Sequence, residues 1–203
     1  MDKKSHWEDV YQNKKINEVS WYQDRPKISL RMIDAAKLSF DDPIIDVGGG
    51  ASRLVDHLIE LGFRNLTVLD ISGKALEHAK QRLGNAGKNI KWVKADIVEF
   101  KPKATYAFWH DRAVFHFLTN LGDRQRYLET MRGALSHPAY AMIASFALDG
   151  PEKCSGLLVQ RYSHEILEQT LGPDYHLIAK DQEMHLTPAG KPQSFIYDLF
   201  RKE

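Results

Sequence analysis

The chain has 203 residues and a formal net charge of +1, which favours one α/β domain and argues against a strongly electrostatic nucleic-acid binder. No apolar run approaches the roughly 18 residues of a membrane span, and the charged segment 1–10 lacks the apolar core of a signal peptide. The single cysteine, Cys154, excludes an intrachain disulfide and fits a reducing compartment, so we expect a cytoplasmic protein.

The first forty residues differ from the rest of the chain. They contain two aromatic pairs: Trp7 with Tyr11, and Trp21 with Tyr22. Pro26 is suited to the first turn of a helix that runs to about Leu38. The residues expected to face inward on this helix are Leu30, Ile33 and Leu38.

From residue 44 on, short apolar runs alternate with amphipathic stretches, which predicts strands connected by helices. The predicted strands are Ile44–Val47, Leu66–Leu69, about Ile90–Lys94, about Tyr106–Trp109 and about Tyr140–Phe146. Leu54, Leu58 and Leu61 form the inward stripe of a first helix that stops at Gly62.

Two further helices follow from their caps. Ser72 is expected to cap a helix with Leu76, Ala79 and Leu83 inward, ending at Gly84. Asp123 is expected to cap a helix that carries Tyr127, Met131 and Leu135.

The last part of the chain predicts a β-hairpin. Two strand-like segments, about His176–Leu186 and Ser194–Arg201, are joined by a short turn with Pro188, Gly190 and Pro192. No helix fits between the segments, and only antiparallel neighbours can be joined by a tight turn.

The most informative segment is the turn after the first strand. Gly48, Gly49 and Gly50 can adopt a sharp turn and let a ligand approach the backbone. Asp70 ends the next strand, where a carboxylate can accept hydrogen bonds from both ribose hydroxyls. Three glycines alone also suit an ordinary strand-to-helix turn, but with Asp70 at this spacing they predict a nucleoside site.

Two cofactor classes use this geometry. A dinucleotide loop requires a third glycine, and that position holds Arg53. The run Asp46-Val47-Gly48-Gly49-Gly50 instead resembles motif I of class I S-adenosylmethionine-dependent methyltransferases, with Ser52 where the extended motif has another glycine. The terminal hairpin resembles the end of the seven-stranded sheet of that family.

This resemblance covers about Ile44–Arg201 and implies the fold and the cofactor. The fold is α/β, a three-layer Rossmann-like sandwich with a mostly parallel seven-stranded sheet that ends in an antiparallel β-hairpin. Residues 1–203 are expected to be a single domain, with a helical lid or substrate segment over 1–40 and the core over 41–203. The cofactor is S-adenosyl-L-methionine, with S-adenosyl-L-homocysteine as product.

The resemblance also implies roles for individual residues. Gly48, Gly49 and Gly50 approach the methionine end of the cofactor, Asp46 orients its ammonium group, and Asp70 holds the ribose. Ile71 packs on the adenine with Ser72 nearby, Asp96 accepts from the adenine amino group, and Ile97 sandwiches the ring. The alternative for Asp96 is a solvated loop acid.

Residues that follow the fourth strand are candidates for the chemistry, because strand ends line the ligand crevice of an open sheet. His110 is a candidate for contacting the cofactor, and His110 or Asp111 for accepting a proton from the acceptor. Asp111 and Arg112 are either a structural ion pair or a substrate clamp. A packed polar loop is the alternative for all three, and packing is the interpretation for His116.

The acceptor region is predicted from aromatic residues and Cys154. Aromatic faces attract a sulfonium cation, which makes Trp21 and Tyr22 candidates for a lid over the substrate. The alternative is a helix docked on the sheet. Cys154 lies in a loop after the fifth strand that can reach the acceptor pocket.

The opening His-Trp-Glu-Asp-Val-Tyr and the later Ser-Trp-Tyr resemble a bacterial subgroup related to protein-lysine and thiopurine-type methyltransferases. The expected reaction is methyl transfer to a small-molecule or protein nucleophile by in-line displacement, by a monomer or weak dimer without a metal. The alternatives are a non-catalytic S-adenosylmethionine-binding protein and, further away, a nicotinamide-dependent oxidoreductase. Base methylation of nucleic acid is disfavoured, because His-Asp-Arg-Ala stands where such enzymes often carry Asn/Asp-Pro-Pro-Tyr/Phe.

Overall fold

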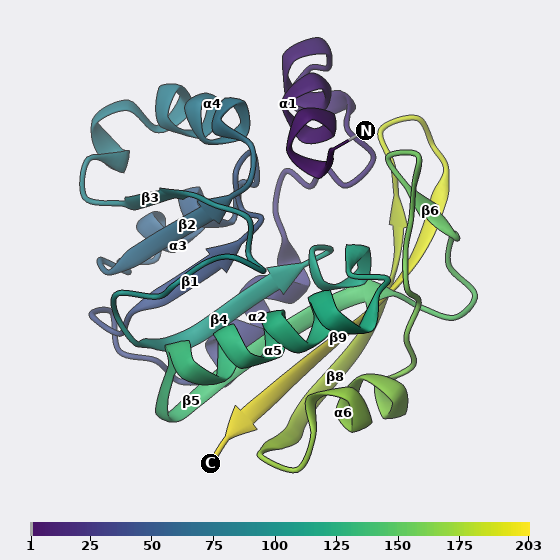
Figure 1. Ribbon diagram of the computed structural model, residues 1–203. Helices are drawn as coiled ribbons and strands as arrows, with labels where there is room; N and C mark the ends of the chain where they lie inside the picture. The colour runs from purple at the N-terminus through teal and green to yellow at the C-terminus, as the bar shows by residue number, and fades with distance from the viewer. Residues whose placement is uncertain (1) are drawn as a thin grey trace.

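A single seven-stranded sheet runs through the computed structural model, which describes residues 2–203 (Figure 1). Its strands are β1 (Ile44–Val47), β2 (Leu66–Asp70), β3 (Lys91–Lys94), β4 (Tyr106–Arg112), β5 (Leu135–Phe146), β8 (Tyr175–Leu186) and β9 (Pro192–Lys202). They lie in the order β3-β2-β1-β4-β5-β9-β8, and only the pairings of β9 with β5 and β8 are antiparallel. The predicted mostly parallel sheet with a terminal hairpin is confirmed.

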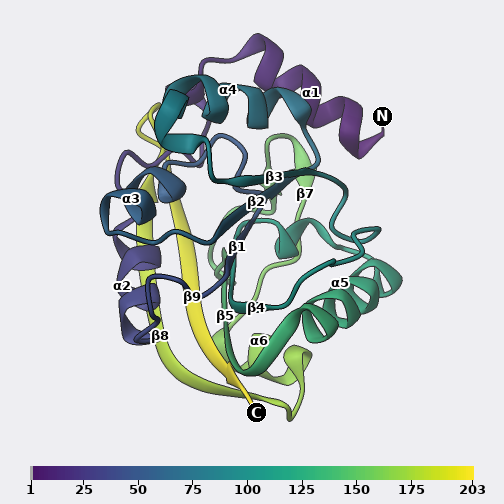
Figure 2. The same ribbon diagram turned by 90° about the vertical axis from the view of Figure 1, so that its left-hand side faces the viewer.

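Helices cover both faces of the sheet. The helices α2 (Lys27–Ala35) and α3 (Leu54–Glu60) pack on one face, where Met32, Ile33 and Leu58 are buried against Phe108. The helices α5 (Leu121–Ala134) and α6 (His164–Leu171) pack on the opposite face around Trp109. Figure 2 shows the resulting three layers, with the sheet between the two pairs of helices. Burial of these apolar stripes is the main stabilising contribution.

Smaller elements surround the carboxyl ends of the parallel strands. The helix α1 (Lys3–Asn13) lies beside α4 (Gly73–Leu83) above this edge (Figure 1). The short elements near this edge are the 3-10 helices η1 (Ile16–Glu18) and η3 (Phe115–Phe117) and the hairpin of β6 (Lys153–Cys154) with β7 (Leu157–Leu158). The 3-10 helix η2 (Gly84–Gly87) lies at the opposite edge, between α4 and β3. Neither α6 nor the β6–β7 hairpin is predicted by the apolar pattern.

Capping residues explain most helix boundaries, and the structure corrects two expectations about the helices. Ser72 caps α4 by accepting from the amide of Ala75, as predicted, and Gly84 ends it with a φ of 51°. Helix α5 is capped by Asn120, which accepts from the amide of Asp123, so the prediction of Asp123 as the cap is wrong. Leu61 is 49% exposed and does not belong to the inward stripe of α3.

Strand β4 extends further than the apolar run predicts. His110, Asp111 and Arg112 belong to the strand, because β1 and β5 provide pairing partners on either side. Successive side chains of a strand point to opposite faces. His110 and Arg112 therefore share one face of the sheet, and Asp111 lies on the other.

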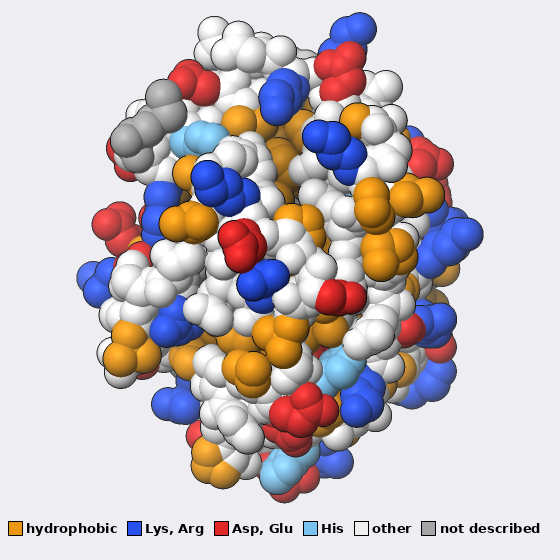
Figure 3. Space-filling model, turned by 90° about the vertical axis from the view of Figure 1, so that its right-hand side faces the viewer, with side chains coloured by type: hydrophobic (Ala, Val, Ile, Leu, Met, Phe, Trp, Pro, Cys, Tyr) orange, Lys and Arg blue, Asp and Glu red, His pale blue; other side chains and the backbone are white. Residues whose placement is uncertain are grey.

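None of the helices in residues 2–203 is long and apolar enough to cross a bilayer. Figure 3 shows one face with lysine, arginine and acidic side chains interspersed and with hydrophobic side chains in a recess in its upper half. Within the same residues, His, Cys, Asp and Glu side chains form no group of three that could hold a metal ion.

Candidate functional site

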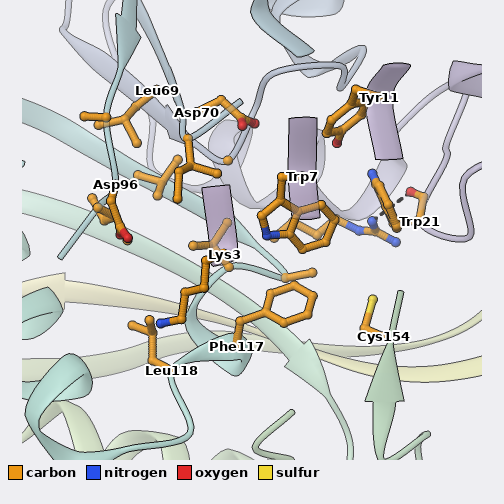
Figure 4. A pocket seen from close by; sticks show the side chains of 18 residues that line it. Lys3, Trp7, Tyr11, Trp21, Leu69, Asp70, Asp96, Phe117, Leu118 and Cys154 are labelled. Atoms are coloured by element: carbon orange, nitrogen blue, oxygen red, sulfur yellow. Dashed lines mark hydrogen bonds between the residues drawn. The ribbon is translucent and has the colours of Figure 1, made fainter. Parts of the chain in front are cut away.

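A cavity with about 800 Å³ of empty space, open to solvent, lies at the carboxyl ends of β1, β2 and β4 (Figure 4). Ligands of open α/β sheets bind at this edge. The lining residues come from both the sheet and the N-terminal segment: Lys3, Trp7, Tyr11, Trp21, Val47, Gly48, Leu69, Asp70, Ile71, Ala95, Asp96, Ile97, Arg112, Ala113, Val114, Phe117, Leu118 and Cys154.

Asp70 lies on the floor of this cavity at the end of β2. Its carboxylate accepts from the amide of Gly50 at 3.0 Å and from the amide of Ser72 at 2.8 Å. Burial raises the pKa of Asp70 to about 6, although these two amides oppose the shift. Each oxygen retains a free lone pair, so Asp70 can accept two further hydrogen bonds from a ligand.

The three glycines leave room that any side chain would fill. Gly48 has a φ of 68°, and a Cβ there would lie 2.1 Å from Cγ2 of Val114. A Cβ on Gly49 would lie 2.2 Å from Oδ2 of Asp46, and a Cβ on Gly50 would lie 2.5 Å from Oδ2 of Asp70. The glycines therefore keep the backbone close to both carboxylates.

Three of the residues predicted to contact adenine line this cavity. Ile71, Asp96 and Ile97 all line it, and Oδ1 of Asp96 accepts from the amide of Val98 at 3.1 Å. Ser72 does not line the cavity, because its fully buried hydroxyl is occupied at the N-terminus of α4.

A second, adjoining cavity lies between the glycine turn and α2. His110 spans its wall: Nδ1 lies 2.7 Å from Oδ1 of Asp46, and Nε2 lies 2.9 Å from Oγ of Ser29. All three side chains are buried. Because both ring nitrogens are already engaged, His110 positions Asp46 and is not available to an acceptor as a base.

Two buried polar atoms at this second cavity have no partner among the described residues. They are Oδ2 of Asp46 and Nε of Arg53. Leaving such atoms without a hydrogen bond is costly, so a ligand that supplies both a donor and an acceptor is expected to bind between them.

Asp111 has a different role from the one predicted. It lies on the α5 face of β4 and accepts from the hydroxyl of Tyr127 at 2.6 Å and from the amide of Val114 at 2.8 Å. Burial raises the pKa of Asp111 to about 6, and these hydrogen bonds limit the shift. Asp111 holds the turn before η3 and is found in the lining of neither cavity described above.

Aromatic side chains from separate segments form the roof of the first cavity (Figure 4). Trp7 lies edge-on to Trp21 at 5.5 Å and to Phe117 at 5.1 Å between ring centroids. Tyr11 contacts Trp21 at 6.1 Å. Tyr22 is not part of this cluster; it lines the second cavity, and its hydroxyl donates to Asp24.

The carboxylate of Glu8 makes several of the contacts that hold helix α1 over the cavity. The carboxylate of Glu8 accepts from the hydroxyl of Ser72 at 2.8 Å, from the amides of Gly73 and Lys74 at 3.0 Å, and from Nζ of Lys94 at 2.8 Å. Burial opposes ionisation, but these donors outweigh it and lower the pKa of Glu8 to about 2. The first residue of α1, Lys3, is fixed by an ion pair of 2.9 Å with Asp123.

Cys154 lies at the end of the first cavity that faces away from Asp96 (Figure 4), and Arg112 lines the same cavity. Arg112 also lines the second cavity and is therefore at their junction. Cys154 is 3% exposed, and burial raises its pKa to about 12. It is a neutral thiol at neutral pH.

Several residues of the site are not predicted from the sequence as site residues. Trp7, Tyr11 and Phe117 are visible there only as aromatic residues, and Ser29, Lys3 and Glu8 carry no signal. The sequence draws attention to Arg53 only because it occupies the position where a dinucleotide loop has its third glycine. The others reach the site through tertiary packing.

Residues 44–137, from β1 into β5, match the protein family described as a methyltransferase domain. A protein solved in work on the conversion of a disulfide bond into a thioacetal group during echinomycin biosynthesis is 16% identical and superimposes with a TM-score of 0.78 over 98% of this chain and 93% of its own. This is the fold of the class I methyltransferases. The predicted Rossmann-like class I methyltransferase fold is therefore confirmed.

Two proteins named as methyltransferases superimpose over nearly the whole chain. A S-adenosylmethionine-dependent methyltransferase from Anabaena variabilis is 14% identical, with a TM-score of 0.76 over 100% of this chain and 96% of that one. The N-methyltransferase NodS from Bradyrhizobium japonicum, solved with S-adenosylhomocysteine, is 15% identical, with a TM-score of 0.67 over 96% and 97%. At sequence identities this low, the two superpositions show a shared fold and nothing more.

One curated relative is matched over a shorter stretch. The mouse (Mus musculus) protein named eEF1A lysine and N-terminal methyltransferase is 22% identical over 102 residues, or 50% of this chain and 14% of the mouse protein. The chain thus corresponds to a small part of that methyltransferase.

Proposed function

We propose that this protein transfers a methyl group from S-adenosylmethionine to a small-molecule nucleophile bound in the first cavity. The observation that carries the proposal is the pair of buried, unpartnered atoms on the second cavity, Oδ2 of Asp46 and Nε of Arg53. An α-amino acid end has one ammonium group and one carboxylate, which complement these two atoms.

The nucleoside end is supported by the adjoining cavity. Asp70 has free lone pairs for two ribose hydroxyls, and Asp96 has a second carboxylate oxygen for an amino group. Ile71 and Ile97 provide apolar surface for a ring. Gly48 lines both cavities, so a ligand that passes the glycine turn would extend from one into the other.

When bound, the cofactor supplies an electrophilic methyl group, and the protein supplies alignment. Holding donor and acceptor in an attack geometry can contribute ~7–11 kcal/mol. Trp7, Trp21 and Phe117 pack together in the lining of the first cavity, where apolar rings would reduce the access of water to a bound cofactor. We propose α1, η1 and the segment up to Tyr22 as the lid; α2 belongs to the core because it is packed on the sheet.

Titration calorimetry with S-adenosylmethionine, S-adenosylhomocysteine and NAD tests the proposal. We expect the first two to bind in the micromolar range or tighter, and NAD not to bind. Asp46→Asn replaces the oxygen that the ammonium group requires and should weaken binding by about tenfold, which corresponds to ~1.4 kcal/mol. Asp174→Asn is a matched control, since Asp174 is 54% exposed and pairs with Arg132.

Failure of both adenosyl ligands to bind would contradict the proposal. Binding without turnover over a panel of thiols, small acids and lysine peptides would favour the alternative of a non-catalytic binding protein. A nicotinamide enzyme is disfavoured by Arg53 at the third glycine position and by the β8–β9 hairpin. The buried free thiol of Cys154 accords with the predicted reducing, cytoplasmic compartment.

A further inference from the structure

We infer that the methyl acceptor is a small organic anion and that Arg112 pairs with its negative charge. The inference rests on the proposed function and deepens it, because it assigns a chemical class to the acceptor. Its basis is the placement of a buried, incompletely paired guanidinium at the junction of the two cavities.

The guanidinium of Arg112 is rigidly held by neighbouring groups. Nε donates to the hydroxyl of Tyr197 at 2.8 Å, and Nη1 donates to the carbonyl of Trp21 at 3.1 Å. The group also lies 4.6 Å above the ring of Phe195. Two of its three nitrogens are thereby fixed, which orients the third.

That third nitrogen, Nη2, is buried and donates to no atom of residues 2–203. The nearest acid is Glu183, whose Oε2 is 3.9 Å away, beyond hydrogen-bond distance. Glu183 is instead occupied with the hydroxyl of Tyr197 at 2.6 Å and with Gln23 at 2.9 Å. The Arg112 side chain is only 10% exposed, so bulk water does not satisfy Nη2.

The sulfonium of the cofactor would lie at this junction, between its two ends. A guanidinium beside a second cation is unfavourable unless an anion lies near both. An anionic acceptor meets this requirement, because it can contact Nη2 while its lone pair faces the methyl carbon.

The cavity lining offers no general base at this end. Of the titratable groups that line the first cavity, Asp70 and Asp96 lie at the nucleoside end, and Lys3 and Arg112 are cations. Burial raises the pKa of the Tyr11 hydroxyl far above neutrality and that of the Cys154 thiol to about 12. An acceptor that is already deprotonated in water needs no base.

The electron balance agrees with an anion. The lone pair of the acceptor forms the new bond to carbon, and the carbon–sulfur pair returns to sulfur. One anion and one sulfonium become a neutral methylated product and a neutral thioether, and no proton moves. A protonated lysine would instead have to lose a proton next to Arg112.

The experiment uses the full chain saturated with S-adenosylhomocysteine, whose binding is verified first. Matched aromatic probes that differ only in charge are then titrated: benzoate, 2-naphthoate and thiophene-2-carboxylate, their primary amides and their aminomethyl analogues. At least one acid should bind at least about tenfold more tightly than its amide and its amine, in line with ~1.4 kcal/mol for a partly buried charge pair.

Two variants locate the charge. Arg112→Met, saturated with S-adenosylhomocysteine at its own measured affinity, should lose the preference for acids, and Arg112→Lys should retain part of the preference. Arg161→Met is the control, because Arg161 binds the carbonyl of Gly150 elsewhere. Should Arg112→Met fail to fold, the comparison in the wild-type chain decides alone.

Equal or weaker binding of every acid relative to its amide overturns the inference while the cofactor site stands. An unchanged acid preference in Arg112→Met also overturns it. Absence of S-adenosylhomocysteine binding at the outset contradicts the proposed function instead, so the two failures are distinguishable.

Discussion

The two ends of the site are built in different ways. The nucleoside end is formed by strand ends and the turns that follow them, with Asp70 held by backbone amides. The acceptor end is formed by α1, Trp21, η3 and the β6–β7 hairpin, which meet through aromatic contacts. The first end is part of the sheet, whereas the second is assembled from peripheral segments.

This difference suits a rigid cofactor end on the sheet and an adaptable acceptor end on the peripheral segments. A sheet edge fixes the cofactor atoms within the tolerance that an in-line displacement requires. Peripheral segments can vary or move without disturbing the sheet. Substitutions at the nucleoside end should therefore change cofactor affinity, and those at the periphery should change rates of entry and exit.

The largest effect is expected for Asp70→Ala. The variant loses two hydrogen bonds from ribose hydroxyls to an ionised acceptor, each worth ~1.5–3 kcal/mol, so cofactor affinity should fall by at least about 100-fold. Calorimetric titration with S-adenosylhomocysteine measures this, with thermal denaturation to verify folding. An affinity within threefold of wild type would refute the ribose assignment.

Glu8→Gln tests the peripheral end with a smaller expected effect. The charge on α1 that pairs with Lys94 and the N-terminus of α4 is lost, so α1 should undock more often. We expect dissociation of S-adenosylhomocysteine to accelerate by about tenfold. Stopped-flow measurement of the intrinsic tryptophan fluorescence, to which Trp7 and Trp21 contribute, gives this rate. Glu77→Gln is the control, because Glu77 lies on α4 and pairs with Lys74. A normal off-rate in Glu8→Gln would exclude α1 as the lid.

The pH dependence of binding should come mainly from the sheet end. The pKa of Asp70 is raised to about 6 by burial, and only the ionised carboxylate accepts from both ribose hydroxyls. Affinity for S-adenosylhomocysteine should be constant above that pKa and fall up to about tenfold per pH unit below it. Calorimetry between about pH 7.5 and pH 5 measures the slope, and Asp70→Asn should flatten it. A slope that persists in Asp70→Asn would assign the titration to another group.

The smallest effect on binding is expected for Tyr127→Phe. The hydroxyl of Tyr127 donates to Asp111 and accepts from the indole of Trp109 at 2.8 Å. Its loss should lower the free energy of unfolding by ~1–2 kcal/mol and leave cofactor affinity unchanged. Chemical denaturation and calorimetry separate these readouts. A shift in the pH–rate profile of methyl transfer would restore Asp111 as a candidate base.

The sequence predicts the nucleoside end because its geometry is local. Asp46, the three glycines and Asp70 lie next to strands that the apolar pattern reveals, and parallel strands end at one edge. The hairpin of β8 and β9 is predictable for the same reason, since its turn is short.

The acceptor end is not local, and sequence reasoning fails there for identifiable reasons. Glu8 accepts a hydrogen bond from the N-terminus of α4, which is 65 residues away in the sequence. The hydrophobic pattern around Glu8 does not predict that contact. The end of β4 depends on pairing with β1 and β5, which decides that Arg112 faces the cavity and Asp111 faces α5. A one-residue error in a strand end reverses such an assignment.

The glycine turn has a consequence for mutational tolerance. A side chain at Gly48 would collide with Val114, and replacing Val114 by a smaller residue could relieve this collision. The φ of 68° at Gly48 would still disfavour a residue with a side chain. A side chain at Gly49 or Gly50 would collide with Asp46 or Asp70, and those acids cannot shrink without losing the ligand. In a mutant library, second-site suppressors should therefore arise for Gly48→Ala and be absent for Gly49→Ala and Gly50→Ala. Of the three glycines, Gly48 is thus the one that we expect to be replaceable after a compensating substitution.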